Sequence, residues 1–392
     1  MTVADRMNNL GTETAFEVLA KARALEAQGR DMVHLEIGEP DFDTPAHITE
    51  AAIQALKEGY THYGPAAGLP ELRESIANNV NKTRGISVTP DRVLVTPGGK
   101  PIMFFTILTL AQEGDEVLYP NPSFPIYESM IRFCGATPVP VRLVEEDGYR
   151  MDLDDLASKL SSCTKLVIIN SPQNPAGSMM PKEEVESLAA ILKDREDVYV
   201  LSDEIYKDIV YSGDHFSIAA VEGMEQRTII LDGFSKSYAM TGWRLGYGVY
   251  PDALIPHVVK LAANSVSCAA SFTQRAAIAA LEGTQEPVRE MAAEFHRRRD
   301  LIVAGLRSIP GVSCPEPEGA FYAFPNISGT GISSHDFQER ALNEAGVALL
   351  AGSAFGEFGE GYIRLSYANS QENIKKALSR LSDFVSKNGK SR

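Results

Sequence analysis

Cysteine and histidine are scarce in this sequence and scattered along it. The four cysteines lie far apart and include no C-x-x-C pair, and the seven histidines show no H-E-x-x-H spacing. These are the arrangements from which zinc sites and disulfide frameworks are recognised in a sequence. We therefore predict no disulfide framework and no metal in the functional site.

Basic residues are outnumbered by acidic ones, 37 against 52, which gives a formal net charge of −15. Nucleic acids and anionic membrane surfaces attract basic proteins, so neither is an expected partner. The longest apolar run, residues 102–111, contains two threonines and is too short to cross a bilayer. The segment Met1 to Asn9 carries charges and amides in place of the apolar stretch of a signal peptide. These absences predict a soluble cytoplasmic protein.

Strand and helix patterns alternate through the middle of the chain, which has 392 residues and a hydrophobic content of 44%. Strands are expected at residues 93–96, 117–119, 165–169, 198–201, 228–231 and 245–249. Alternation of this kind implies right-handed crossovers and a largely parallel sheet, hence the α/β class. After about residue 282 the pattern becomes mixed, beginning with a long charged helix at 287–306. We expect a large domain of residues 48–281 and a smaller α+β domain made of residues 1–47 and 282–392.

Polar residues gather where four of the expected strands end. Gly98 and Gly99 follow one strand, Asn174 a second, Asp203 and Tyr206 a third, and a Ser-Lys pair a fourth. Ligands of parallel sheets bind outside the carboxyl ends of the strands, and a helix that starts after two glycines suits a phosphate. Each cluster also has an ordinary alternative, a turn for the glycines and the asparagine, and a helix cap for the aspartate. Occurring together, they predict one ligand site.

The most informative stretch is residues 233–247, which reads GFSKSYAMTGWRLGY. Arg244 offers the bidentate fork that binds phosphate, and Ser235 offers a hydroxyl. Lys236 is the kind of side chain that forms an imine with a carbonyl cofactor. The residues alone predict a phosphate clamp around a lysine nucleophile, with two plain surface charges as the alternative.

The stretch and the clusters together resemble the class I and II aminotransferases, the fold type I enzymes that depend on pyridoxal 5′-phosphate (PLP). Within that family the sequence looks closest to the branch of thermophile-type bacterial aspartate aminotransferases. The resemblance runs from G-E-P-D-F at 38–42 to R-L-S-Y-A at 364–368. It implies the fold type I architecture, with Lys236 as the catalytic residue, joined to the cofactor through an imine and then free to move a proton.

The resemblance also assigns the remaining cofactor contacts. Phe124 would stack on the pyridine ring, Asn174 and Tyr206 would bind its phenolic oxygen, and Asp203 would pair with the ring nitrogen. The residues expected to hold the phosphate are Gly98, Gly99 and Lys100 through their backbone, together with Ser235 and Arg244.

A substrate site and a partner subunit follow from the same resemblance. Arg364 would bind the substrate α-carboxylate, helped by the Gly38 backbone and by Asn174. Lys100 is a candidate for reading a distal carboxylate, with a solvated or structural lysine as the alternative. Tyr63 would reach the cofactor phosphate of the neighbouring subunit, which implies a homodimer.

The implied activity is amino-group transfer between an L-amino acid and a 2-oxo acid in a PLP/PMP ping-pong cycle. Aspartate or alanine with glutamate and 2-oxoglutarate are the expected substrates. A PLP-dependent lyase or cyclase of the same fold is the alternative; a non-catalytic regulator would need a basic DNA-binding segment, which the sequence lacks. The chain departs from the family pattern at Gly233, where many relatives carry a phosphate-binding Ser, at Ala176 and at Pro101. These departures touch only the finer cofactor contacts.

Overall fold

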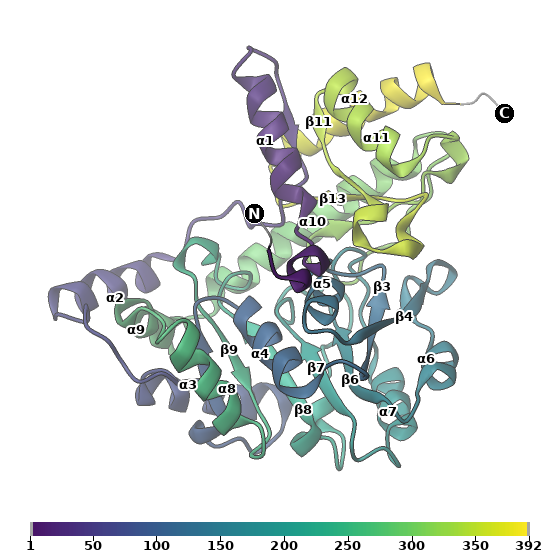
Figure 1. Cartoon of the computed structure of the whole chain (residues 1–392). Helices are drawn as coiled ribbons and strands as arrows, with labels where there is room; N and C mark the ends of the chain where they lie inside the picture. Colours follow the sequence, from purple (N-terminus) through teal and green to yellow (C-terminus); the bar gives the residue numbers. More distant parts are fainter. Residues whose placement is uncertain (1–2, 390–392) are drawn as a thin grey trace.

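A computed structural model describes residues 3–389, so the ends of the expected small domain, residues 1–2 and 390–392, lie outside the described part. The lower part of the molecule is built around an eight-stranded sheet in the order β2-β9-β8-β7-β6-β3-β4-β5 (Figure 1). The strands are β2 (Val93–Thr96), β3 (Glu116–Asn121), β4 (Thr137–Val144), β5 (Arg150–Met151), β6 (Thr164–Asn170), β7 (Tyr199–Asp203), β8 (Thr228–Gly233) and β9 (Gly246–Val249). All except β5 and β9 run in the same direction, which confirms the α/β class and the largely parallel sheet.

The strand expected at 245–249 is present as β9, but it runs antiparallel to both neighbours, β2 and β8. Only residues 234–245 separate it from β8, and they form a loop with one short 3₁₀ turn, Thr241–Trp243. A parallel return usually needs a whole crossover helix in addition to its loops. The chain therefore turns straight back, and this loop carries both Lys236 and Arg244.

Helices cover both faces of the sheet. In β6, Leu166 and Ile168 belong to one buried cluster, whereas Val167 and Ile169 belong to another. Alternate residues of a strand point to opposite faces, so each cluster marks one covered face. The helices of this part are α2 (Ala46–Lys57), α3 (Pro70–Arg84), α4 (Lys100–Leu110), α5 (Ile126–Phe133), α6 (Leu153–Lys159), α7 (Lys182–Ile191), α8 (Ile255–Ser265) and α9 (Ser271–Glu282).

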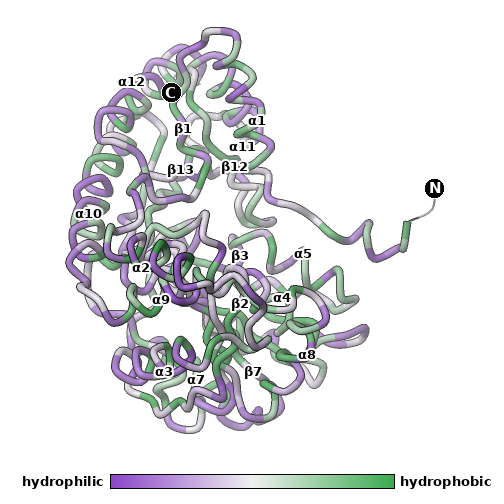
Figure 2. Tube along the Cα trace, turned by 90° about the vertical axis from the view of Figure 1, so that its left-hand side faces the viewer, coloured by the Kyte–Doolittle hydropathy of each residue, from purple (hydrophilic) through white to green (hydrophobic). Residues whose placement is uncertain are grey.

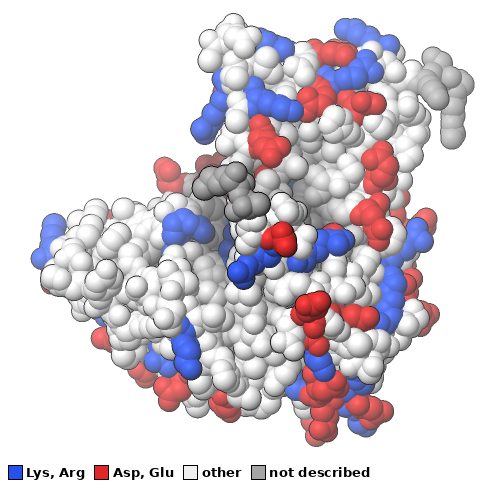
Figure 3. Space-filling view, in the orientation of Figure 1, with Lys and Arg blue, Asp and Glu red and all other residues white. Residues whose placement is uncertain are grey.

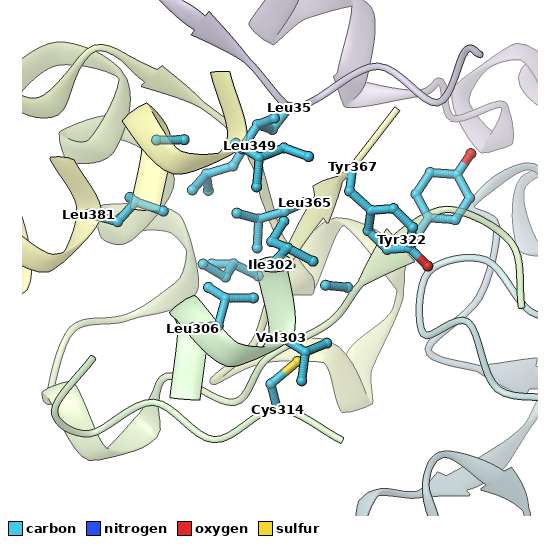
Figure 4. Close-up of a cluster of buried hydrophobic side chains, with 14 of the residues drawn as sticks. Leu35, Ile302, Val303, Leu306, Cys314, Tyr322, Leu349, Leu365, Tyr367 and Leu381 are labelled. Atoms are coloured by element: carbon cyan, nitrogen blue, oxygen red, sulfur yellow. The ribbon is translucent and has the colours of Figure 1, made fainter. Parts of the chain in front are cut away.

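The upper part of Figure 1 joins the N-terminal helix to the last third of the chain. Its strands are β1 (Val33–His34), β10 (Tyr322–Ala323), β11 (Val347–Ala348), β12 (Leu350–Ala351) and β13 (Ile363–Ser366), and its helices are α1 (Thr14–Glu26), α10 (Glu286–Arg307), α11 (Ser334–Arg340) and α12 (Gln371–Asn388). Their shared core includes Leu35, Ile302, Leu365 and Leu381 (Figure 4). Tyr322 lies at the edge of this cluster, with its hydroxyl pointing away from it (Figure 4).

The long helix expected at 287–306 is confirmed as α10. Ser370 caps the closing helix α12, because its hydroxyl accepts a 3.1 Å hydrogen bond from the Asn373 backbone N–H. The described residues of the N-terminal segment, from residue 3, form an exposed arm whose short 3₁₀ helix, Asp5–Asn9, lies next to α5 (Figure 2). Within residues 3–389, no helix is long and apolar enough to cross a membrane.

Candidate active site

A cleft of about 510 Å³ opens at the carboxyl ends of the parallel strands, between the two parts of the molecule. Figure 3 shows a hollow there with basic side chains beside it. The predicted site residues that line it are Gly38, Gly99, Lys100, Phe124, Asn174, Asp203, Tyr206, Ser235, Lys236, Arg244 and Arg364. Residues that are up to 326 positions apart, from Gly38 to Arg364, therefore meet in one place, as the single-site prediction required.

Lys236 lies three residues beyond the end of β8 and lines the cleft. Its Nζ donates a 2.5 Å hydrogen bond to the Gly38 carbonyl oxygen and lies 5.7 Å from the centroid of the Phe321 ring. Burial lowers the pKa of this amine to about 8, since a charged ammonium loses hydration inside the protein. The alternative that Lys236 is a plain surface charge is therefore wrong.

Asp203 ends β7 and is almost fully buried, with 7% of the residue exposed. Oδ2 accepts a 2.6 Å hydrogen bond from the Tyr127 hydroxyl, and Oδ1 accepts one from the Ile205 backbone N–H at 3.2 Å. Burial raises the pKa of Asp203 to about 6, because few groups around it compensate the charge. The alternative that it caps a helix fails, since a turn and no helix follows β7. A cationic ligand group beside this carboxylate would restore its ionised form.

Two glycines allow the loop after β2 to pack against the loop between β8 and β9. Gly98 has φ +88°, and a Cβ there would lie 2.3 Å from Nη2 of Arg244. A Cβ on Gly246 would lie 2.6 Å from the Gly99 nitrogen. The guanidinium of Arg244 is thereby held beside the N-terminus of α4, whose first turn has no side-chain cap. Backbone N–H groups at a helix start and an arginine form a donor set that fits a phosphate.

Arg364 reaches the cleft from β13 and is buried, at 5% exposure. Nη1 donates to Asn174 Oδ1 at 3.2 Å and Nη2 to the Glu36 carbonyl oxygen at 2.5 Å, whereas Nε has no hydrogen-bond partner in the described chain. The guanidinium carbon lies 4.6 Å from the centroid of the Tyr322 ring. Burial lowers the pKa of Arg364 from its usual value. A buried cation with an unused donor suits a carboxylate ligand.

Three further residues enter the site that the sequence analysis did not identify. Tyr127 holds Asp203, as described above. Tyr322 lies with its hydroxyl 2.8 Å from that of Tyr206 and covers Gly38, where a Cβ would lie 2.0 Å from the Tyr322 hydroxyl. Glu13 forms an ion pair with the Lys100 amine inside the cleft. The aromatic run at 321–324 was a usable signal for Tyr322, and Tyr127 lies only three residues after the predicted Phe124, whereas nothing near Glu13 in the sequence indicates a site.

Tyr63 does not reach the cleft within this chain. It is 91% exposed and precedes the Gly64-Pro65 loop, away from the lining residues. Gly98 also does not line the cleft itself, but packs behind Arg244.

Comparisons with known proteins agree with this geometry. The sequence model of the family described as aminotransferase class I and II matches residues 30–381. The chain is 41% identical over 382 residues to an aspartate aminotransferase of Pyrococcus horikoshii, covering 97% of this chain and 96% of that protein. It is 38% identical to aromatic-amino-acid aminotransferase 2 of Thermococcus litoralis, covering 97% of each.

A solved structure with the same fold is the aspartate aminotransferase from Thermus thermophilus with maleate. It superposes with a TM-score of 0.93 at 39% identity, covering 98% of this chain and 99% of that one. None of these relatives is named for elimination or cyclisation, so the lyase alternative finds no support. The chain belongs to the class I and II aminotransferase family, and it is a PLP-dependent transaminase that moves an amino group between an amino acid and a 2-oxo acid.

Proposed function

We propose that the cleft described above carries out this exchange, with Lys236 as the catalytic residue. The observation that carries the proposal is that the Lys236 amine, the buried Asp203 carboxylate and the buried Arg364 guanidinium line one cleft. With its pKa lowered to about 8, far more of the Lys236 amine is neutral at physiological pH than in an ordinary lysine. Lys236 Nζ would accept the proton from the substrate Cα and later return it.

PLP, when bound, supplies an aldehyde that condenses with amines and a protonated ring that withdraws electrons from the substrate. Lys236 would hold the cofactor covalently. The phosphate would be bound by the backbone of Gly98, Gly99 and Lys100, the Ser235 hydroxyl and the Arg244 guanidinium. Glycine at position 98 leaves room for the Arg244 guanidinium, which supports the assignment of Arg244 to the phosphate.

The ring of the cofactor would be oriented by four other side chains. Asp203 would pair with the ring nitrogen, a role that suits a carboxylate whose pKa burial has raised, because the ring cation then compensates its charge. Phe124 would stack on the ring, and Asn174 with Tyr206 would bind the phenolic oxygen. Tyr322 supports the Tyr206 hydroxyl through their 2.8 Å contact.

Arg364 would bind the α-carboxylate of the substrate, with the Gly38 backbone and Asn174 completing that end of the site. Binding there would orient the Cα–H bond toward Lys236, which is a positioning effect. We propose aspartate or alanine as the amino donor and 2-oxoglutarate as the acceptor, with Lys100 as the reader of a distal carboxylate. The names of the relatives, which include aspartate aminotransferases, support this choice.

The working form would be a homodimer in the cytoplasm. Tyr63, exposed at 91%, would complete the phosphate site of the partner subunit, and the exposed apolar residues Ile53 and Leu56 of nearby α2 support a covered face. The large domain would comprise residues 48–281 and the small one residues 1–47 and 282–392. Sedimentation of the purified protein tests the dimer. A comparison of PLP affinity between the wild-type protein and the Tyr63→Ala variant tests the contribution of Tyr63.

Borohydride reduction of the holoenzyme followed by peptide mapping tests the central assignment. The pyridoxyl group is expected on the peptide that contains residue 236, and the Lys236→Ala variant should neither be labelled nor exchange amino groups. Label on another peptide, or exchange by Lys236→Ala, would refute the role of Lys236. A panel of amino donors and 2-oxo acids then tests the substrate assignment.

A further inference from the structure

Glu13 and Lys100 form an ion pair inside the cleft, although 87 positions separate them in the chain. Lys100 is the first residue of α4, and Glu13 immediately precedes α1. The Lys100 amine also lies 5.7 Å from the centroid of the Phe124 ring. The pair therefore lies next to the ring proposed to stack on the cofactor.

The segment that carries Glu13 is anchored on the large sheet's side of the cleft. Gly11 N–H donates a 2.8 Å hydrogen bond to Ser129 Oγ of α5, and Ala15 is buried. Glu13 occupies the cap position of α1, yet its side chain makes no capping hydrogen bond there. The carboxylate instead projects to Lys100, and its side chain is only 20% exposed. The position of Glu13 is thus fixed by Gly11 before it and by Ala15 after it.

The other cations of the cleft have tasks under the proposed function. Arg364 is assigned to the α-carboxylate, and Lys236 and Arg244 to the cofactor. Lys100 alone is left to read a distal carboxylate, but it is already neutralised by Glu13. Apolar side chains, Phe16 and Ile37, line the same cleft. An uncharged substrate side chain can therefore enter without disturbing the ion pair, whereas an acidic one must displace Glu13 from Lys100.

We propose that Glu13 is a specificity-determining residue, which competes with the distal carboxylate of acidic substrates for Lys100 and so admits uncharged side chains to the same site. This inference rests on the proposed function. Like charges repel and a partly buried carboxylate is poorly screened, so Glu13 would oppose an acidic substrate both directly and by occupying its partner.

The test uses single-turnover half-reactions of the PLP-loaded protein with one amino donor at a time, aspartate or phenylalanine. For Glu13→Gln, we expect the ratio of aspartate to phenylalanine reactivity to rise about three- to fivefold, the value of a partly exposed ion pair. Two unreactive ligands should show the same preference: the variant should bind succinate more tightly relative to 3-phenylpropionate than the wild-type protein does. A variant with normal circular dichroism and an unchanged ratio would overturn the proposal, and Glu13→Ala repeats the test if Glu13→Gln folds poorly.

Glu339→Gln is a matched control, because Glu339 forms an ion pair with Lys21 of α1 at 2.7 Å outside the cleft. It should leave the ratio unchanged.

A fall in aspartate reactivity for Glu13→Gln would show that Glu13 holds Lys100 in place for the substrate, and would also overturn the proposal. In a Lys100→Met background, Glu13→Gln should give a clearly smaller gain; an equal gain would rule out competition for Lys100.

These outcomes are separable from failure of the proposed function. If wild-type protein loaded with PLP exchanged amino groups with neither donor, the assignment of the cleft itself would fail. If both donors reacted and the Glu13 variants did not change their ratio, only the present inference would fail.

Discussion

The Tyr127 hydroxyl donates a 2.6 Å hydrogen bond to Asp203 Oδ2 and thereby joins α5 to the end of β7. This bond lowers the pKa of Asp203, whereas burial raises it more strongly, with the net result of about 6. Tyr127 is thus a positioning residue that keeps the carboxylate both oriented and easier to ionise.

Removing this hydroxyl should weaken cofactor binding in a pH-dependent way. In Tyr127→Phe the pKa of Asp203 rises, so at pH 6 more of the carboxyl is protonated and unable to pair with the ring cation. We expect PLP affinity to fall about tenfold at pH 6 and much less at pH 8, as measured by equilibrium dialysis. Tyr119→Phe, which removes a 2.8 Å hydrogen bond to Glu128 outside the cleft, is the control. Equal losses at both pH values would indicate a purely structural role.

A side chain at position 98 should displace Arg244. Gly98→Ala places a Cβ 2.3 Å from Arg244 Nη2, so we expect the affinity for PLP to fall at least about tenfold as a charged hydrogen bond to the phosphate is lost. Gly85→Ala is a matched control, because Gly85 also has positive φ, +69°, but a Cβ there meets nothing within 4 Å. Both variants should lose about 1 kcal/mol of stability from backbone strain, and only Gly98→Ala should lose cofactor affinity. Unchanged affinity in Gly98→Ala would remove Arg244 from the phosphate site.

Much of the fold could be predicted because the buried strands are short β-branched runs with polar residues at their ends. That pattern identified β6, β7 and β8 and the chemistry that follows each of them. Helix α3 went unpredicted although Pro70 begins it and Gly85 ends it, because its buried face includes Ser75 and its mean hydropathy is low. The sequence analysis did not assign the direction of β9, although the short connection after β8 favours a direct antiparallel return.

Lys236 and Asp203 were singled out by their residue type and their places after strands, and Arg364 by the family resemblance; all three line the cleft. The site was not predictable where a residue acts only through a distant partner. Tyr127 is 76 positions from Asp203, and Glu13 is 87 from Lys100. An ordinary tyrosine and an ordinary glutamate acquire these roles because the fold brings α5 to the end of β7 and the start of α1 to the start of α4.

His34 should make the stability of the protein depend on pH. Its Nδ1 lies 2.7 Å from buried Glu36 Oε1, and its Nε2 lies 3.1 Å from Glu26. The hydrogen bond to Glu36 raises the pKa of His34, whereas burial lowers it by a smaller amount. The net result in the folded protein is a pKa of about 9. Because the folded pKa is above the unfolded value of 6.5, the stabilisation is complete below pH 6.5 and is lost as pH rises through about 9.

The substitution His34→Gln should therefore lower the free energy of unfolding by about 2 kcal/mol at pH 6, and by clearly less at pH 9.5. Urea denaturation at the two pH values measures both differences. His257→Gln serves as control, because this exposed imidazole makes no side-chain hydrogen bond within residues 3–389. A loss of the same size at both pH values would show that His34 contributes packing alone. The backbone carbonyl of Glu36 also accepts a hydrogen bond from Arg364. If the loss of stability is confined to low pH, we therefore expect succinate to bind more weakly at low pH as well.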